Sequence, residues 1–351
     1  MREVAVVSFA QSKHVRRLPD LNEVEMLMPV LGEVREKIGI TQDRIGFTCS
    51  GSTDYLAGQA FSFVMTLDGV GAWPPIVESH VEMDGAWALY EAWVKLQSGE
   101  IDTALVYSYG KSSPGSVRDV LTRQLDPYYV APLWPDAVGM AALQARAVMD
   151  ADGVTERDFA EVASRNRAHG KSNPYAQLVG DFAVDKLMTD PYIVAPLRKH
   201  ACPPISDGAA AVILAAGDAA RELCDRPAWI RGIDHRIETH AFGARNLARS
   251  PSAALAAERA GAMRDKIDVA ELHAPFASQE IVLRRSLGLS EATVVNPSGG
   301  PLAANPVMAA GLIRIGEAAE RIRRGDCDRA LAHATSGHCL QQNLVCVLEG
   351  A

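Results

Sequence analysis

The stretch GEIDTALVYS, residues 99–108, returns in altered form as GDCDRALAHA, residues 325–334, and this repetition decides the fold. Both copies carry Gly, an acid, Asp, Ala and Leu in the same register, at an offset of 226 residues. A weaker pair, DRIGFTCS at 43–50 and DKIDVAEL at 265–272, keeps the same order at an offset of 222. Chance matches need not keep order and spacing, so the sequence predicts two homologous halves.

Short runs rich in strand-forming residues alternate with longer Ala- and Leu-rich segments of helical pattern. The runs include VAVVSF, TALVYSY, AAVILAA and RALAHA. This alternation predicts a layered α/β fold whose sheets are largely buried. The halves are predicted as residues 1–225 and 226–351. Turn-forming residues gather at about 108–200, so we expect an inserted loop region there in the first half.

The composition excludes several classes of protein. Lys and Arg number 35 against 43 Asp and Glu, which gives a net charge of −8 and argues against a nucleic-acid partner. The first residues form an apolar run followed by basic residues, the reverse of a signal peptide, and no apolar run reaches membrane-spanning length, so a cytoplasmic location is expected. The six cysteines are scattered, which predicts neither disulfides nor a metal site.

Three loops are predicted to meet over one pocket. HVEMDG, residues 80–85, precedes a helix in the first half, and SGGPLAANP, residues 298–306, occupies the matching place in the second. Equivalent loops of two related halves tend to face one another across their interface. ELHAPF, residues 271–276, is expected to reach the same place from the end of its own strand.

These motifs resemble the thiolase superfamily over essentially the whole chain. NPSGGPLAANPVMAAGLIRIGEAA resembles the Asn-Pro-Ser-Gly-Gly segment of thiolases, ELHAPF resembles their His-containing strand end, and SDGAAAVILA their central strand. The subgroup it looks most like is the lipid-transfer or sterol-carrier type found in actinobacterial steroid side-chain degradation. The resemblance implies the thiolase fold, a duplicated five-layered α-β-α-β-α arrangement with mixed sheets.

The resemblance also shows where this sequence departs from thiolases. The position of the nucleophilic Cys falls on Glu82, and the family's Gly-His-Pro histidine falls on Asn305. His273 keeps the histidine of the strand-end motif. The C-terminal segment, which supplies a catalytic Cys in degradative thiolases, does not align cleanly here, and it holds His338 and Cys339.

Chemistry that needs no nucleophile remains possible. Retro-aldol cleavage of a β-hydroxyacyl-CoA requires a base for the hydroxyl proton and donors for the enolate oxygen. Glu82 is the predicted base, with Asp84 as a further catalytic candidate and His273 and Asn305 as oxyanion donors. Either acid could instead only cap the following helix. The expected substrate-binding residues are His80, Ser298, Gly299, Gly300, His338 and Cys339.

The resemblance implies a subunit of a steroid side-chain-cleaving aldolase, with CoA as part of the substrate and no separate cofactor. Two other functions stay open: a non-catalytic partner of an active thiolase-like paralogue, and an acyltransferase or sterol carrier. The implied partners are a steroid acyl-CoA, a paralogous thiolase-like subunit and a zinc-ribbon/OB-fold acyl-CoA-binding protein, in a homo- or hetero-oligomer.

Overall fold

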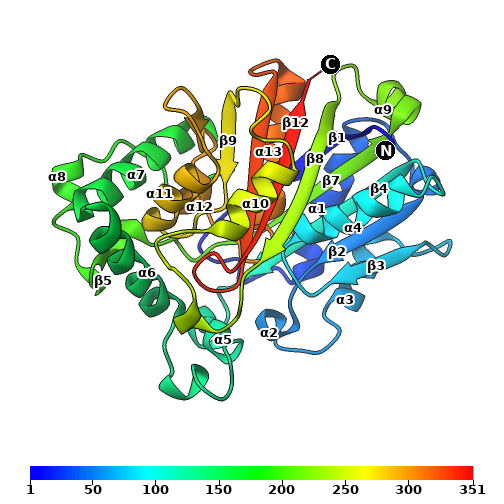
Figure 1. The fold of residues 1–351 in the computed structure, drawn as a ribbon. Helices are drawn as coiled ribbons and strands as arrows, with labels where there is room; N and C mark the ends of the chain where they lie inside the picture. The colour runs from blue at the N-terminus through cyan, green and yellow to red at the C-terminus, as the bar shows by residue number, and fades with distance from the viewer. Residues whose placement is uncertain (351) are drawn as a thin grey trace.

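The centre of the molecule is a mixed sheet of ten strands (Figure 1). In the computed structural model, which describes residues 1–350, the strands run in the order β10-β9-β11-β12-β8-β1-β7-β4-β2-β3. The strands are β1 Val4–Gln11, β2 Phe47–Gly51, β3 Glu78–Val81, β4 Thr103–Lys111, β7 Asp207–Ala216, β8 Ala228–Ile237, β9 Val269–Leu272, β10 Val294–Val295, β11 Arg329–Ser336 and β12 Gln342–Glu349.

The sheet consists of two five-stranded halves with the same order and the same strand directions. The first is β1-β7-β4-β2-β3 and the second is β8-β12-β11-β9-β10. In each, the first three strands are antiparallel neighbours and the last three are parallel neighbours. The predicted sequence pairs fall on β4 and β11 and on β2 and β9, which hold matching places. The two halves join where β1 pairs with β8, at Ala5 opposite Trp229.

Two matching helices, α4 (Gly85–Gln97) and α13 (Ala310–Arg324), form the buried middle layer. They pack on each other and share one hydrophobic core with strands of both halves. Apolar residues at helical spacing on α4, such as Ala88, Leu89 and Leu96, are fully buried, as expected for a helix inside the molecule. The other helices outside the segment between β4 and β7 are α1 Glu23–Glu36, α2 Asp54–Ala57, α3 Phe63–Val70, α9 Gly217–Leu223, α10 Pro251–Arg259, α11 Ala277–Ser286 and α12 Gly300–Ala303.

The segment between β4 and β7 forms a mainly helical region beside α11 and α12 (Figure 1). It contains α5 Val117–Arg123, α6 Ala137–Asp152, α7 Glu156–His169, α8 Val184–Leu187 and the short pair of strands β5 Tyr192–Val194 and β6 Leu197–Arg198. A buried carboxylate ties it to the second half, because Glu280 of α11 accepts a hydrogen bond from Asn166 of α7 at 2.7 Å. The inserted region is therefore packed against the C-terminal half, and any cavity between them has the insertion as one wall.

The predicted fold class is confirmed: this is a layered α/β protein with mixed sheets in a duplicated arrangement. The predicted division after residue 225 falls in the short connection between α9 and β8. Among residues 1–350, none of the helices combines the length and the apolar character needed to cross a membrane.

Candidate active site

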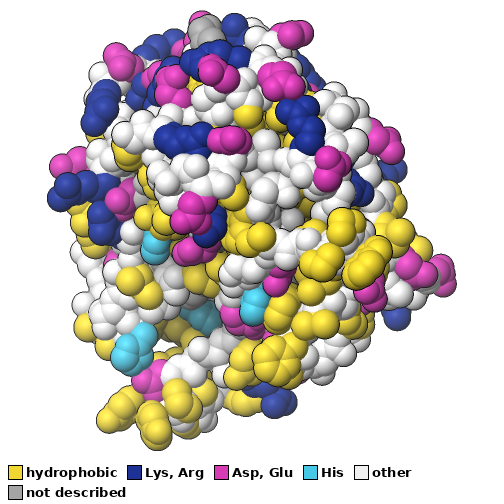
Figure 2. All heavy atoms as spheres, turned by 90° about the vertical axis from the view of Figure 1, so that its right-hand side faces the viewer, with side chains coloured by type: hydrophobic (Ala, Val, Ile, Leu, Met, Phe, Trp, Pro, Cys, Tyr) yellow, Lys and Arg dark blue, Asp and Glu magenta, His cyan; other side chains and the backbone are white. Residues whose placement is uncertain are grey.

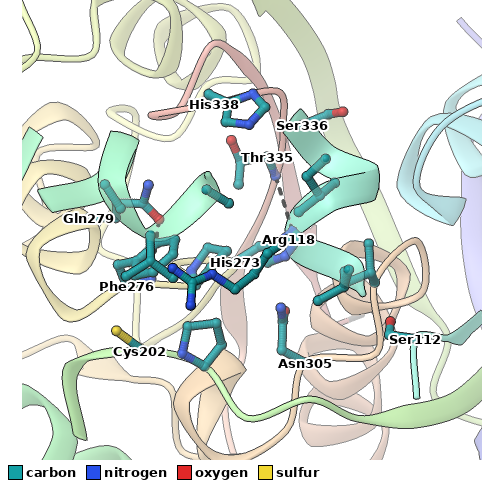
Figure 3. Close-up of a pocket in the computed structure, with 18 of the residues that line it drawn as sticks. Ser112, Arg118, Cys202, His273, Phe276, Gln279, Asn305, Thr335, Ser336 and His338 are labelled. Carbon is teal, nitrogen blue, oxygen red and sulfur yellow. Dashed lines mark hydrogen bonds between the residues drawn. The ribbon is translucent and has the colours of Figure 1, made fainter. Parts of the chain in front are cut away.

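A cavity of about 330 Å³ lies between the insertion and the facing loops of the two halves (Figure 3). Its walls are mainly hydrophobic, with Val117, Leu121, Val138, Ala141, Ile193, Pro203, Pro204, Ile205, Pro275, Phe276, Val307 and Met308 among the lining residues. Each of the three predicted loops brings one polar group to it: Asp84 before α4, His273 after β9 and Asn305 after α12. The predicted meeting of the loops is direct, since Gly85 N donates a hydrogen bond to Met308 O at 2.8 Å.

His273 is held as a neutral hydrogen-bond donor. Its Nδ1 accepts a hydrogen bond from the backbone N–H of Thr335 at 3.3 Å (Figure 3). A backbone N–H can only donate, so the proton of the neutral ring is on Nε2. Burial is the main cause that lowers the pKa of His273 to about 3, and the nearby His333 ring and Arg314 guanidinium act in the same direction. The ring can therefore donate from Nε2 at neutral pH but cannot supply a positive charge.

Asn305 brings a second polar group to the same place. Its backbone N–H donates to Ser206 Oγ at 3.0 Å, which fixes the chain before Pro306. Its side-chain amide points toward His273 in the pocket (Figure 3). The buried Oδ1 atom has no hydrogen-bond partner among the described residues, so no such bond fixes the orientation of the amide, and its NH2 group is the donor that it can offer to a ligand.

Asp84 sits between the N-termini of the two middle helices. Its carboxylate accepts hydrogen bonds from Ala86 N of α4 at 2.9 Å and from Gly311 N and Leu312 N of α13 at 2.8 and 3.0 Å. Gly311 is required here, because an added Cβ would lie 2.4 Å from Asp84 Oδ1. Burial raises the pKa of Asp84 to about 6, although the three amides favour the charged form. The carboxyl group can thus exchange a proton near neutral pH.

Glu82 does not face the pocket, and this corrects the expectation that it stands there as the base. Its side chain is exposed, and Oε1 accepts a hydrogen bond from Asp54 N at 2.6 Å, which ties the loop to the start of α2. The two acids are separated by one residue, so the turn into α4 directs them to different sides. His80, predicted to bind substrate, is also exposed outside the pocket and stacks on Phe63 with 3.5 Å between the ring centroids.

Ser298, Gly299 and Gly300, also predicted to bind substrate, lie beneath the site and not on the cavity surface. Ser298 donates from both its backbone N and its hydroxyl to the buried carboxylate of Glu271, at 2.9 and 2.7 Å. Arg314 of α13 donates to the same carboxylate at 2.7 Å. Gly299 has φ of +99°, and an added Cβ would lie 2.9 Å from Gly170 Cα. These residues hold the loop that presents Asn305.

His338 and Cys339 do line the cavity, as predicted, in the loop after β11. Burial lowers the pKa of His338 to about 4, and its buried Nε2 has no partner among the described residues. Burial raises the pKa of Cys339 to about 12, and its Sγ donates to Met140 O at 3.3 Å. The pocket also contains Cys202, whose pKa burial likewise raises to about 12. Both thiols stay protonated and are poor nucleophiles.

Sequence reasoning missed several pocket residues that come from the insertion, from α11 and from the end of β11. They include Ser112, Arg118, Gln124, Cys202, Gln279 and Thr335. The insertion has no counterpart in the second half, so the internal repeat could not be used to predict where its side chains lie. Thr335 lies near the end of β11, one residue beyond the repeated stretch, and it contributes a backbone N–H, which the residue type does not reveal.

Comparison with known proteins identifies sequence relatives that are named as acetyl-CoA acetyltransferases and sterol carrier proteins. No family model matches the sequence. The chain is 28% identical to an acetyl-CoA acetyltransferase of Methanothermobacter thermautotrophicus, over 92% of this chain and 91% of that protein. It is 26% identical to sterol carrier protein 2 of Bos taurus, over 68% of this chain, and spans about half of that longer protein, 51% of its length.

Solved structures show the same fold. The chain matches the structure titled Ltp2-ChsH2(DUF35) aldolase with a TM-score of 0.82 at 18% identity, over 99% of this chain and 97% of that one. It matches human mitochondrial 3-ketoacyl-CoA thiolase with a TM-score of 0.79 at 15% identity, over 100% of this chain and 99% of that one. The chain has the thiolase fold. The sequence relatives named above are similar to it over 92% and 68% of its length.

Proposed function

We propose that this chain is the catalytic subunit of an aldolase that cleaves a β-hydroxyacyl-CoA by a retro-aldol reaction, with no covalent bond to the enzyme. One observation carries the proposal: the pocket joins a carboxyl group that titrates near neutrality, a neutral histidine donor and a free amide, at Asp84, His273 and Asn305. The structural neighbour whose title names an aldolase supports the same reaction type.

Asp84 is suited to accept the substrate proton. Its Oδ1 accepts two backbone N–H groups, but Oδ2 accepts only that of Gly311, which leaves an acceptor site on Oδ2. Loss of the β-hydroxyl proton to Oδ2 lets a carbonyl form at Cβ as the Cα–Cβ bond breaks. The electrons of that bond pass to the thioester as an enolate, and the proton on Asp84 then returns to Cα.

The enolate oxygen needs donors that are already in place before the bond breaks. Nε2–H of His273 and the amide of Asn305 are placed to bind it, and a neutral imidazole donates without itself needing to lose a proton. Because the His273 ring accepts a backbone N–H and the Asn305 backbone donates to Ser206 Oγ, little reorganisation is needed when the negative charge develops.

Thiolysis by the usual two-step route requires a thiolate that forms a covalent thioester. The loop that leads into α4 reads Glu82, Met83 and Asp84, with no cysteine. Cys202 and Cys339 reach the pocket, but burial raises the pKa of each to about 12. These features favour aldol chemistry over thiolase chemistry.

The substrate we propose is a large apolar acyl thioester, such as a steroid side chain joined to CoA. The support is the hydrophobic character of the walls and the similarity to sterol carrier protein 2. CoA enters as part of the substrate, and the proposed chemistry uses no additional cofactor.

A second subunit completes the proposal. Hydrophobic side chains gather on the face that carries α2, α3 and β3 (Figure 2), and Phe61, Trp73 and Val77 there are 71%, 87% and 58% exposed. Among the described strands, β3 pairs with β2 alone, so its other edge is free. This face suits a second copy or a paralogous thiolase-like subunit, and the aldolase neighbour's title names two components, which supports an additional partner subunit.

The test uses a CoA thioester with a tertiary β-hydroxyl group, which cannot be oxidised to a ketone. Purified protein, alone and with its co-purified partners, is incubated with this compound, and the products are measured by mass spectrometry. Asp84→Asn, His273→Ala and Asn305→Ala are each expected to lower kcat at least about a hundredfold. Glu82→Gln is the matched control and should retain activity.

Two results would contradict the proposal. Full activity in Asp84→Asn and His273→Ala would assign the chain a supporting role beside an active paralogue. Loss of activity in Glu82→Gln, with activity retained in Asp84→Asn, would mean that Glu82 and not Asp84 is the base. The pH profile gives a further check, since kcat/KM should rise as the pH increases through about 6, where Asp84 loses its proton.

A further inference from the structure

The pocket contains a cation that the retro-aldol reaction does not use. Arg118 on α5 lines the cavity, and it is the one Lys or Arg among the lining residues that the structure describes. Its side chain extends across the pocket toward Phe276 and Cys202 (Figure 3). The Arg118 charge acts on the thiol of Cys202, where it opposes the effect of burial on the pKa.

Arg118 keeps donors free for a ligand. One terminal nitrogen donates to Asp136 Oδ2, and a guanidinium carries five N–H donors. Asp136 is itself engaged as the N-cap of α6, where Oδ1 accepts Gly139 N at 2.7 Å. One oxygen of Asp136 thus accepts from Arg118 and the other from the helix N-terminus. This contact holds the guanidinium in place and leaves its other N–H groups unbound by Asp136.

The cavity walls near α5 offer Arg118 few other partners. Apart from the Asp136 carboxylate, residues that line this part of the cavity, such as Val117, Leu121 and Phe276, have no acceptor in their side chains. A neutral apolar acyl chain that filled this space would remove water from the guanidinium and give nothing in return. A carboxylate would match the planar pair of N–H donors and form charge-assisted hydrogen bonds.

We propose that Arg118 determines specificity by binding a carboxylate on the acyl chain, remote from the thioester. This inference rests on the proposed function for the position of the thioester carbonyl, at His273 and Asn305. The preferred substrate is then an apolar β-hydroxyacyl thioester that ends in an acidic group. Two polar points in a cavity with mainly hydrophobic walls would fix both the position and the direction of the acyl chain.

The experiment compares paired thioesters that differ in one group, a free distal carboxylate or its methyl ester. In the wild type, kcat/KM for the acid is expected to exceed that for the ester at least about tenfold, as for one charge-assisted hydrogen bond. Arg118→Gln should abolish the difference by lowering the value for the acid alone, and Arg118→Lys should retain part of it. Arg123→Gln is the control, because Arg123 lies on the same helix but over the Trp134 ring, 5.8 Å from its centroid.

Two further arms separate this idea from its alternatives. The same pair is prepared on N-acetylcysteamine, which lacks the phosphates of CoA. If Arg118→Gln slows both CoA thioesters but neither N-acetylcysteamine thioester, Arg118 binds the carrier and the inference is overturned. Equal loss for acid and ester in Arg118→Gln overturns it too. Titration calorimetry with analogues that lack the β-hydroxyl group measures binding without turnover, so the acid preference can be found even if no aldol cleavage occurs.

Discussion

Replacement of Asp84 by Ala should destabilise the protein strongly, because one buried carboxylate satisfies the first turns of two helices. The change leaves three buried N–H groups, those of Ala86, Gly311 and Leu312, without their acceptor. An unsatisfied buried donor costs about 1–3 kcal/mol, so the expected loss is about 3 kcal/mol or more. That is a large part of a typical free energy of unfolding of about 5–15 kcal/mol.

The assay is equilibrium unfolding in urea at pH 7.5, followed by circular dichroism. Asp84→Asn keeps one acceptor oxygen for Ala86 and Leu312 and places an amino group against Gly311, so its expected loss is smaller, about 1–2 kcal/mol. Glu82→Ala, which removes an exposed carboxylate that accepts a single backbone N–H, should cost at most about 1 kcal/mol. If Asp84→Ala and Glu82→Ala were equally stable, the reasoning about the double cap would be wrong.

Three other perturbations test the packing and charge of the buried layer. Burial lowers the pKa of His333 to about 4, so the folded state resists protonation and the free energy of unfolding falls as the pH drops from about 6.5 to 4. His333→Gln should reduce the slope of unfolding free energy against pH in that window by up to about 1.4 kcal/mol per pH unit. Urea titrations at several pH values measure this slope. Gly316→Ala should destabilise by about 1–3 kcal/mol in the same assay, since its Cβ would lie 2.1 Å from a ring atom of Phe9; a neutral result would contradict this close approach. Arg314→Met should cost about 3–5 kcal/mol because it leaves the Glu271 carboxylate buried without its ion pair, and a melting temperature equal to that of the wild type would refute that.

The duplicated fold could be predicted because the repeat lies in strands that hold matching places in the sheet. GEIDTALVYS and GDCDRALAHA contain β4 and β11, and their common pattern reflects the same burial and the same preceding helix. The same reasoning placed the loops before α4 and α13 opposite one another, which the hydrogen bond from Gly85 to Met308 confirms. His273 and Asn305 follow from their loops and line the pocket, while their catalytic roles stay predictions.

The assignment of the acid could not be made from the sequence. Glu82 and Asp84 both precede a helix, and local propensity allows either to cap it. What separates them is the N-terminus of α13, which comes from a segment more than 200 residues away and supplies two of the three amides on Asp84. Arg118 was missed for a related reason, since the insertion has no repeated partner and its side chains are placed only by packing.

The most direct test of the central claim measures whether cleavage of the β-hydroxyacyl thioester needs free CoA or an acyl-enzyme. Wild-type protein with its co-purified partners is incubated with the thioester in the absence of added CoA, and both the products and the intact protein mass are recorded. The account predicts a shortened acyl-CoA and a ketone or aldehyde in equal amounts, with the mass of the chain unchanged. A requirement for added CoA, or an acyl adduct on the chain, would contradict it.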